Sequence, residues 1–251
     1  MLKNPLLLSL FLLLVLGKSH AQNLVPLSEK LLLAVRKEED TKALFEQLKN
    51  TPPQSLDLEL LNDQSKKAFW INIYNALVIS KLKANKALYK KRSAFYSNKQ
   101  IEIAGQALSL DDIEHGILRH SKNKLSLGYL GKIFVGNFEK QNRVKTLDYR
   151  IHFALNCGAK SCPPIAFYSP EKLETQLTLA TNNFLRNTCQ YDSSTNKVNI
   201  SMIFSWFRAD FGGKKGIKSL LKNAKIIPPD KNPSIKFDKY DWDLALENYV
   251  E

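Results

Sequence analysis

The densest run of chemically reactive residue types lies within residues 150–164, where a histidine, two cysteines and two prolines occur together. A thiol becomes a nucleophile when a nearby imidazole or a helix dipole lowers its pKa. His152 and Cys157 lie five residues apart, so a turn or a second segment has to bring them together. Gly158 would let a substrate approach the backbone and would leave its N–H free to stabilise an oxyanion. This pattern predicts Cys157 as a nucleophile with His152 as a candidate base.

A second candidate segment is the helical pattern of residues 110–120, which carries Glu114, His115 and Arg119. A glutamate can orient an imidazole, and an arginine can hold an anionic group of a substrate. The alternative is an ordinary amphipathic helix in which Ile113 and Ile117 face the core and the charges face water. Under the functional interpretation, His115 is a second candidate base, Glu114 orients the base, and Arg119 binds substrate.

The cysteines have other possible roles. Cys157 and Cys162 are close enough in sequence to pair with each other, and Cys189 could pair with either, leaving an odd thiol. Cys157, Cys162, His152 and His115 are also suitable metal ligands in type. The Cys-x4-Cys spacing lacks a second ligand pair at a recognisable spacing, so we expect neither a metal nor a cofactor.

Three polar residues lie on a helix that begins near Asp63 or Ser65 and is apolar on more than one side. Such a helix should be central, and Asn72, Tyr74 and Asn75 are costly to bury on it unless each finds a partner. They either bond neighbouring backbone, including the Cys157 loop, or line a cleft beside that loop and bind substrate.

The elements that position these residues mix helix and strand patterns without a regular βαβ alternation. Helices are expected over 27–48, from 63 or 65, from 109 and from 169; a hairpin is expected over 101–108, and strands over 150–155 and 198–200. This mixture predicts an α+β fold, a helix-rich single domain over residues 22–251 with a small, mostly antiparallel sheet.

Residues 1–21 have the three parts of a signal peptide. Lys3 precedes a leucine-rich run that is too short to cross a bilayer, and Ser19-His20-Ala21 fits a signal-peptidase site. We therefore predict an exported protein, periplasmic or secreted, whose mature chain begins near Gln22. Intact-mass measurement on secreted protein tests this prediction, and a species that retains Met1 would contradict it.

The formal charge of +13 falls to about +11 when Lys3 and Lys18 leave with the leader. This balance would favour an anionic partner or substrate in the envelope, but the lysines are scattered along the chain, and solvated helix faces explain them better. No aromatic-interleaved basic motif accompanies the lysines, so we expect no nucleic-acid partner. No later stretch is long and apolar enough for a transmembrane segment of the mature chain.

The chain resembles the family known as domain of unknown function 547 over about residues 60–245. The matching segments are residues 67–76, 110–119, 150–164, 201–207, 210–212 and 240–244. The resemblance implies an exported bacterial member. Plant members often lack a cysteine at the position of Cys162, which favours Cys157 as the working residue. The family usually has Ser-Leu-Asn where this chain has Asp243-Leu244-Ala245.

Two hypotheses about function follow. The first is a thiol-dependent hydrolase or acyltransferase of the cell envelope, with Cys157 as its nucleophile. The second is a non-catalytic binding module in which the cysteine segment is a disulfide-stiffened loop at the mouth of a groove. Whether the protein is an enzyme depends on the state of Cys157.

Overall fold

A computed structural model describes residues 23–250 of the chain. The predicted leader and the predicted mature start at Gln22 lie outside the described residues.

Helices dominate the described chain, together with short strands. The α-helices are α1 Leu24–Arg36, α2 Lys42–Lys49, α3 Pro53–Glu59, α4 Asp63–Ala84, α5 Arg92–Ser97, α6 Asn137–Asn142, α7 Leu173–Thr188, α8 Ile203–Trp206 and α9 Gly213–Asn223. Tighter 3₁₀ turns are η1 Lys86–Lys91, η3 Tyr149–Phe153 and η4 Pro170–Lys172, and η2 Asp112–Leu118 is π-helical. The strands are β1 Ile101–Ile103, β2 Gln106–Leu108, β3 Gln190–Asp192, β4 Lys197–Ile200 and β5 Ser234–Phe237.

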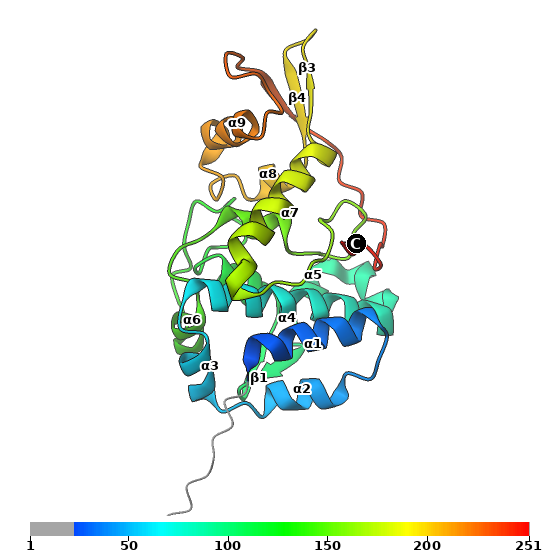
Figure 1. Cartoon of the computed structure of the whole chain (residues 1–251), viewed down its shortest axis with the longest axis vertical. Helices are drawn as coiled ribbons and strands as arrows, with labels where there is room; N and C mark the ends of the chain where they lie inside the picture. The colour runs from blue at the N-terminus through cyan, green and yellow to red at the C-terminus, as the bar shows by residue number, and fades with distance from the viewer. Residues whose placement is uncertain (1–22, 251) are drawn as a thin grey trace, which may run out of the picture.

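The elongated molecule has its N-terminal helices at one end and the β3–β4 hairpin with α9 at the other (Figure 1). Helix α7 runs between these two ends, and α1 packs along α4. Strands β1 and β2 form an antiparallel pair, while β4 pairs antiparallel with β3 and parallel with β5. The predicted helix-rich α+β class with a small, mostly antiparallel sheet is confirmed.

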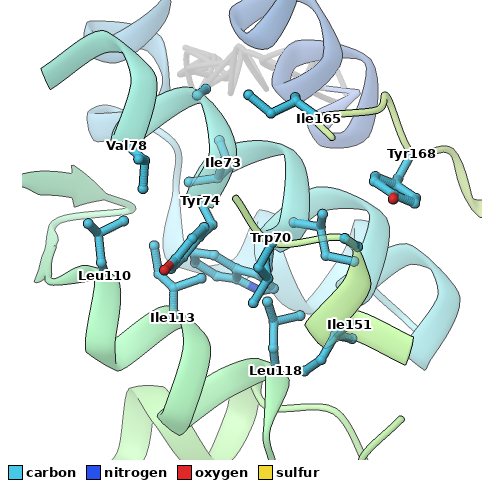
Figure 2. Packing of buried hydrophobic residues seen from close by; sticks show 14 of the residues in the cluster. Trp70, Ile73, Tyr74, Val78, Leu110, Ile113, Leu118, Ile151, Ile165 and Tyr168 are labelled. Atoms are coloured by element: carbon cyan, nitrogen blue, oxygen red, sulfur yellow. The ribbon is translucent and has the colours of Figure 1, made fainter. Parts of the chain in front are cut away.

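Helix α4 is central, as its apolar residues on every side predict. Asn62 caps it by accepting a hydrogen bond from the Ser65 N–H, and Trp70 is fully buried near its middle. Figure 2 shows Tyr74 of α4 directed towards Ile113 on η2. This packing brings η2, and with it Glu114 and His115, against α4, most of whose residues are buried.

Two expected elements differ in the structure. The helix predicted over 27–48 is split into α1 and α2, because the chain turns at Glu38, whose φ is +59°. The strand predicted over 150–155 is wrong: residues 149–153 form η3, capped by the Asp148 carboxylate, which accepts a hydrogen bond from the Arg150 N–H. The apparent alternation misled because Ile151, His152 and Phe153 are all buried, on more than one side of a turn.

Other local predictions are confirmed. The hairpin over 101–108 forms β1 and β2, with Ala104 and Gly105 in its turn. The segment from Ser169 enters η4 and then α7. Among the described residues, no helix is long and apolar enough to cross a membrane.

Candidate functional site

A cavity of about 380 Å³ lies where five parts of the fold meet: α4, η2, α8, the cysteine loop (residues 154–165) and the C-terminal segment (residues 238–250). Its aromatic lining consists of Tyr74, Tyr96, Trp206, Phe207, Tyr240 and Trp242. Cys157, His152, Glu114 and His115 also line it, together with Asp111 and Lys124. The fold therefore brings all four predicted catalytic residues, which lie in two separate segments of the sequence, to one cavity.

A larger hollow of about 480 Å³ lies beside Cys189, but it offers less chemistry. Cys189 is a buried free thiol, and burial raises its pKa to about 12, so it stays protonated and unreactive at neutral pH. The cavity around Cys157 is therefore the better candidate site.

Cys157 and Cys162 form a disulfide, with their Cα atoms 6.0 Å apart. The Tyr240 hydroxyl lies 3.4 Å from Cys157 Sγ and 3.3 Å from Cys162 Sγ. Among the described residues, neither sulfur has a hydrogen bond to a histidine. The prediction of Cys157 as a resting nucleophile is corrected here: its sulfur is bonded to another sulfur, and its polar neighbour is a phenol.

Hydrogen bonds from α4 fix the loop that carries Cys157. The Asn75 side chain donates to the Ala154 carbonyl and accepts from the Asn156 N–H, at 2.9 Å each. The side-chain oxygen of Asn156 in turn accepts a hydrogen bond from the Gly158 N–H at 2.7 Å. Gly158 has φ +79°, and an added Cβ would lie 2.7 Å from Leu82 Cδ1. The expected oxyanion role of the Gly158 N–H is therefore wrong, since that group is buried and already bonded; the glycine serves a tight turn.

The C-terminal segment closes the other side of this loop. Backbone hydrogen bonds join Lys160 N to Asp243 O at 2.7 Å and Ala245 N to Gly158 O at 2.9 Å. This pairing places Tyr240 and Trp242 at the cavity, where their rings lie 4.7 Å apart and pack against Trp206. Residues 243–245 lie in this segment, and these backbone contacts do not depend on side-chain identity.

The pKa of the Glu114 carboxyl group is strongly changed by its surroundings. Its side chain is 14% exposed, and its Oε2 accepts a hydrogen bond from the Tyr74 hydroxyl at 3.1 Å. Burial raises the pKa of Glu114 to about 7, and neighbouring Asp111 raises it too, against the opposing effect of Arg119. At neutral pH the site therefore contains both the acid and the carboxylate, which suits proton transfer or hydrogen bonding to a ligand.

Replacing Glu114 by glutamine should change how stability depends on pH. Because the folded pKa of Glu114 lies above its ordinary value of 4.5, its contribution to stability is complete below pH 4.5 and is lost as pH rises through about 7. As pH rises from 4.5 through about 7, the free energy of unfolding of Glu114→Gln should therefore increase relative to that of the wild type by up to about 3 kcal/mol. Urea melts across this range measure the difference. Glu46→Gln on the exposed surface of α2 is the control, and a parallel pH dependence of both variants would contradict the assignment.

Asp210 organises a buried network behind the cavity wall. Its carboxylate accepts from Arg119 Nε at 2.7 Å and Nη2 at 3.1 Å, and its Oδ2 lies 2.8 Å from His152 Nε2. Arg119 Nη1 lies 2.9 Å from His115 Nδ1. Both Arg119 and Asp210 side chains are fully buried, and the His152 ring stacks on Phe207 at 3.9 Å.

The charges in this network follow from its contacts. Burial lowers the pKa of His115 well below its ordinary value, and the Arg119 guanidinium lowers it further. Burial also lowers the pKa of His152, against the opposing effect of its hydrogen bond to the Asp210 carboxylate. Burial opposes ionisation of Asp210, but His152 and Arg119 outweigh it and lower its pKa. Both imidazoles are therefore neutral beside an Arg–Asp ion pair: His152 donates its Nε2–H to Asp210, and His115 accepts at Nδ1 from Arg119.

Arg119, Asn72 and Asn75 do not occupy the places expected of substrate-binding residues. Arg119 is fully buried and spends its donors on Asp210 and His115, so it cannot reach an anionic group in the cavity. Asn72 is fully buried and bonds the Tyr168 backbone and Ser28. Neither asparagine lines the cavity, because buried amides on a central helix satisfy the backbone of segments packed against it. Of the four expected substrate-binding residues, Tyr74 alone lines the cavity.

The sequence interpretation missed Asp210, Tyr240 and Trp242 as site residues. Residues 210–212 and 240–244 were singled out in the sequence, but distance in the chain hid that Asp210 bonds Arg119 and His152 and that Tyr240 and Trp242 line the cavity. Among residues 23–250, no cluster of three or more His, Cys, Asp and Glu side chains could hold a metal ion.

The fold and site define a helix-rich α+β protein with an aromatic cavity bordered by a disulfide loop. The family model described as "Protein of unknown function, DUF547" matches residues 58–185, and the chain belongs to this family. The match contains α4, η2 and the cysteine loop but ends before Asp210 and Tyr240. No match to the chain was found among curated proteins or among solved structures.

Proposed function

We propose that the protein is a binding module whose cavity holds a small ligand with an apolar or aromatic part. The observation that carries this proposal is the Cys157–Cys162 disulfide, which leaves no thiolate in the cavity. Tyr240, the polar neighbour of both sulfurs, has a pKa raised by burial and is no base at neutral pH. The bridge thus supports a structural role: it stiffens the loop that forms one wall.

The walls indicate the chemistry of the ligand. Trp206, Tyr240 and Trp242 give flat apolar surfaces on which a ring or an alkyl chain packs. Glu114 and Asp111 supply the polar part of the wall. Both accept hydrogen bonds, and Glu114 in its acid form also donates one. With two carboxyl groups against the single cation Lys124, the cavity itself does not favour an anionic ligand.

Export supports this function and is part of the proposal. Disulfides persist in oxidising compartments such as the periplasm and the extracellular space, and the leader-like residues 1–21 favour the same location. The ligand would then be a component of the cell envelope.

A thiol-dependent hydrolase or acyltransferase is the second candidate, for a form in which the bridge has been reduced. The observation in its favour is that Cys157, Glu114, His115 and His152 line one cavity. Against it, no hydrogen bond among the described residues joins either imidazole to Cys157: His152 bonds Asp210 through Nε2 and His115 bonds Arg119 through Nδ1, so either base would have to reach the sulfur with its other ring nitrogen.

Peptide mapping of the unreduced protein, followed by a screen of envelope peptides and glycans, separates the two functions. The wild type is compared with Cys157→Ala and Trp242→Ala before and after reduction with dithiothreitol. For a binding module, nearly all molecules contain the bridge, bound compounds are recovered unchanged, and Trp242→Ala weakens binding. For a thiol enzyme, a compound is consumed after reduction and Cys157→Ala abolishes its consumption. A largely free Cys157 thiol in the unreduced protein would overturn the binding proposal.

A further inference from the structure

An exposed apolar segment borders the cavity. Leu125, Ile133 and Phe134 are 89%, 89% and 92% exposed, and Leu130 is 65% exposed. Six of the twelve exposed large apolar side chains of residues 23–250 lie between positions 125 and 134. Single exposed apolar residues are ordinary, but such a concentration marks an interaction surface. Residues 122–136, which carry these side chains, are called the apolar loop below.

The backbone of the apolar loop is held in place. Lys132 N donates to Ser121 O at 2.7 Å, and Asn123 N donates to Leu130 O at 2.9 Å, which closes the loop at its base. Farther along, Ala209 N donates to Leu127 O at 2.9 Å. An added Cβ at Gly128 would lie 2.2 Å from Asp210 Oδ1, so the loop lies directly against the buried ion-pair network. Leu125 and Leu130 are therefore presented by a hydrogen-bonded backbone beside the site, and Ile133 and Phe134 directly follow its last bond, at Lys132.

The charges around these side chains are mostly positive. Lys122, Lys124, Lys132 and Lys140 lie within residues 122–140; Lys124 pairs with Asp111 and Lys132 with Glu139, so four lysines face two carboxylates here. Lysine is depleted in protein–protein interfaces, whereas apolar side chains interleaved with lysines suit the surface of an anionic bilayer. Each lysine near such a surface adds attraction, and the positive formal charge, about +11 without the leader, acts in the same direction. Charge complementarity thus points to anionic lipid as the occupant of this surface.

The apolar loop is continuous with the cavity, because Leu125 and Leu127 are among the cavity's lining residues. We infer that the apolar loop docks the protein on an anionic lipid bilayer, with Leu125, Ile133 and Phe134 inserted among the headgroups and acyl chains. Docking in this way places the cavity mouth at the membrane surface, where an amphiphilic ligand passes between the bilayer and the cavity. The docking surface itself does not depend on what the cavity binds.

Hydrogen exchange and vesicle co-sedimentation test the inference on the full chain as cells produce it. The vesicles are equal mixtures of phosphatidylglycerol and phosphatidylcholine, with pure phosphatidylcholine for comparison. Anionic vesicles should protect the amides of the apolar loop. Protection is read locally because the leucine-rich residues 1–21, if retained, bind lipid by themselves.

The variant Leu125→Ser/Ile133→Ser/Phe134→Ser should remove the local protection and weaken vesicle binding by at least about tenfold once the leader is absent. The matched control is Leu58→Ser/Leu61→Ser/Leu179→Ser, whose side chains are 71%, 70% and 54% exposed on other elements. The control should bind as the wild type does, and both variants should keep the wild-type melting temperature because the replaced side chains are exposed.

Three outcomes would overturn the inference: absence of protection in the apolar loop with anionic vesicles, equal protection with pure phosphatidylcholine, or an equal loss of binding in the control. Protection of the loop without vesicles that increases with protein concentration would also overturn it, and would assign the surface to a second copy of the chain.

Discussion

Replacing Asp210 by asparagine should lower the free energy of unfolding by about 3–5 kcal/mol, among the largest effects expected of any single substitution. The variant leaves the Arg119 guanidinium fully buried without a counter-charge, and removes one of the carboxylate oxygens that bind it. His152 loses its charged acceptor in the same step. Urea denaturation near neutral pH measures the loss.

The control for this prediction is Glu174→Gln. Glu174 also pairs with an arginine, Arg150, at 2.8 Å, but its side chain is 64% exposed, so its loss should cost less than about 1 kcal/mol. The direction in which the stability contribution of Asp210 changes with pH also follows from its pKa. Because the folded pKa of Asp210 lies below its ordinary value of 3.8, its contribution is present above pH 3.8 and is lost as pH falls through the folded value. Equal shifts for both variants would show that burial of the Asp210 pair carries no special weight.

Replacing Trp70 by alanine should destabilise the fold by about 3–5 kcal/mol, as expected for a large buried aromatic side chain. Trp70 is fully buried on α4, with the Phe69 ring centroid at 4.9 Å and the Phe138 ring centroid at 6.4 Å. Its indole Nε1 has no hydrogen-bond partner among the described residues, so the loss is one of packing. Denaturant melts measure it, and a change below about 1 kcal/mol would show that Trp70 contributes little to the core.

Trp242→Ala provides the matched comparison for Trp70→Ala. Trp242 is partly exposed at the cavity, where it packs against Trp206 and lies under the Arg92 guanidinium at 4.8 Å. Its removal should cost less stability than removal of Trp70 and should act on ligand binding. The two tryptophans thus separate the core of the fold from the wall of the site.

Glu114 and the buried network around Asp210 have different relations to function. Glu114 keeps an altered pKa beside the Tyr74 hydroxyl and faces open space, which are properties of a group that meets a ligand. The network of Arg119, Asp210 and the two histidines is satisfied internally. It joins η3 to Arg119, next to η2, and Gly128 of the apolar loop lies against Asp210, so the network connects the cavity wall to the proposed membrane-facing surface.

Secondary-structure elements with a clear apolar pattern could be predicted from the sequence. The apolar faces of residues 63–84 predicted a central helix because burial on every side leaves no polar stripe. The hairpin over 101–108 followed from two short apolar runs around Gly105. The importance of residues 110–119 and 150–164 was also recognised, because the reactive residue types are concentrated there.

Only the tertiary structure determines which cysteines pair and which partners the side chains of the site reach. Three cysteines allow several pairings, and the turn of η3 together with the C-terminal segment brings Cys157 next to Cys162 while Cys189 remains apart. The same turn directs His152 to Asp210, 58 residues away, and not to Cys157. Tyr240 reaches the two sulfurs across 83 and 78 residues. Residue types and local periodicity are properties of the sequence alone, whereas these contacts depend on how distant segments pack, and that packing determined which predicted site residues face the cavity.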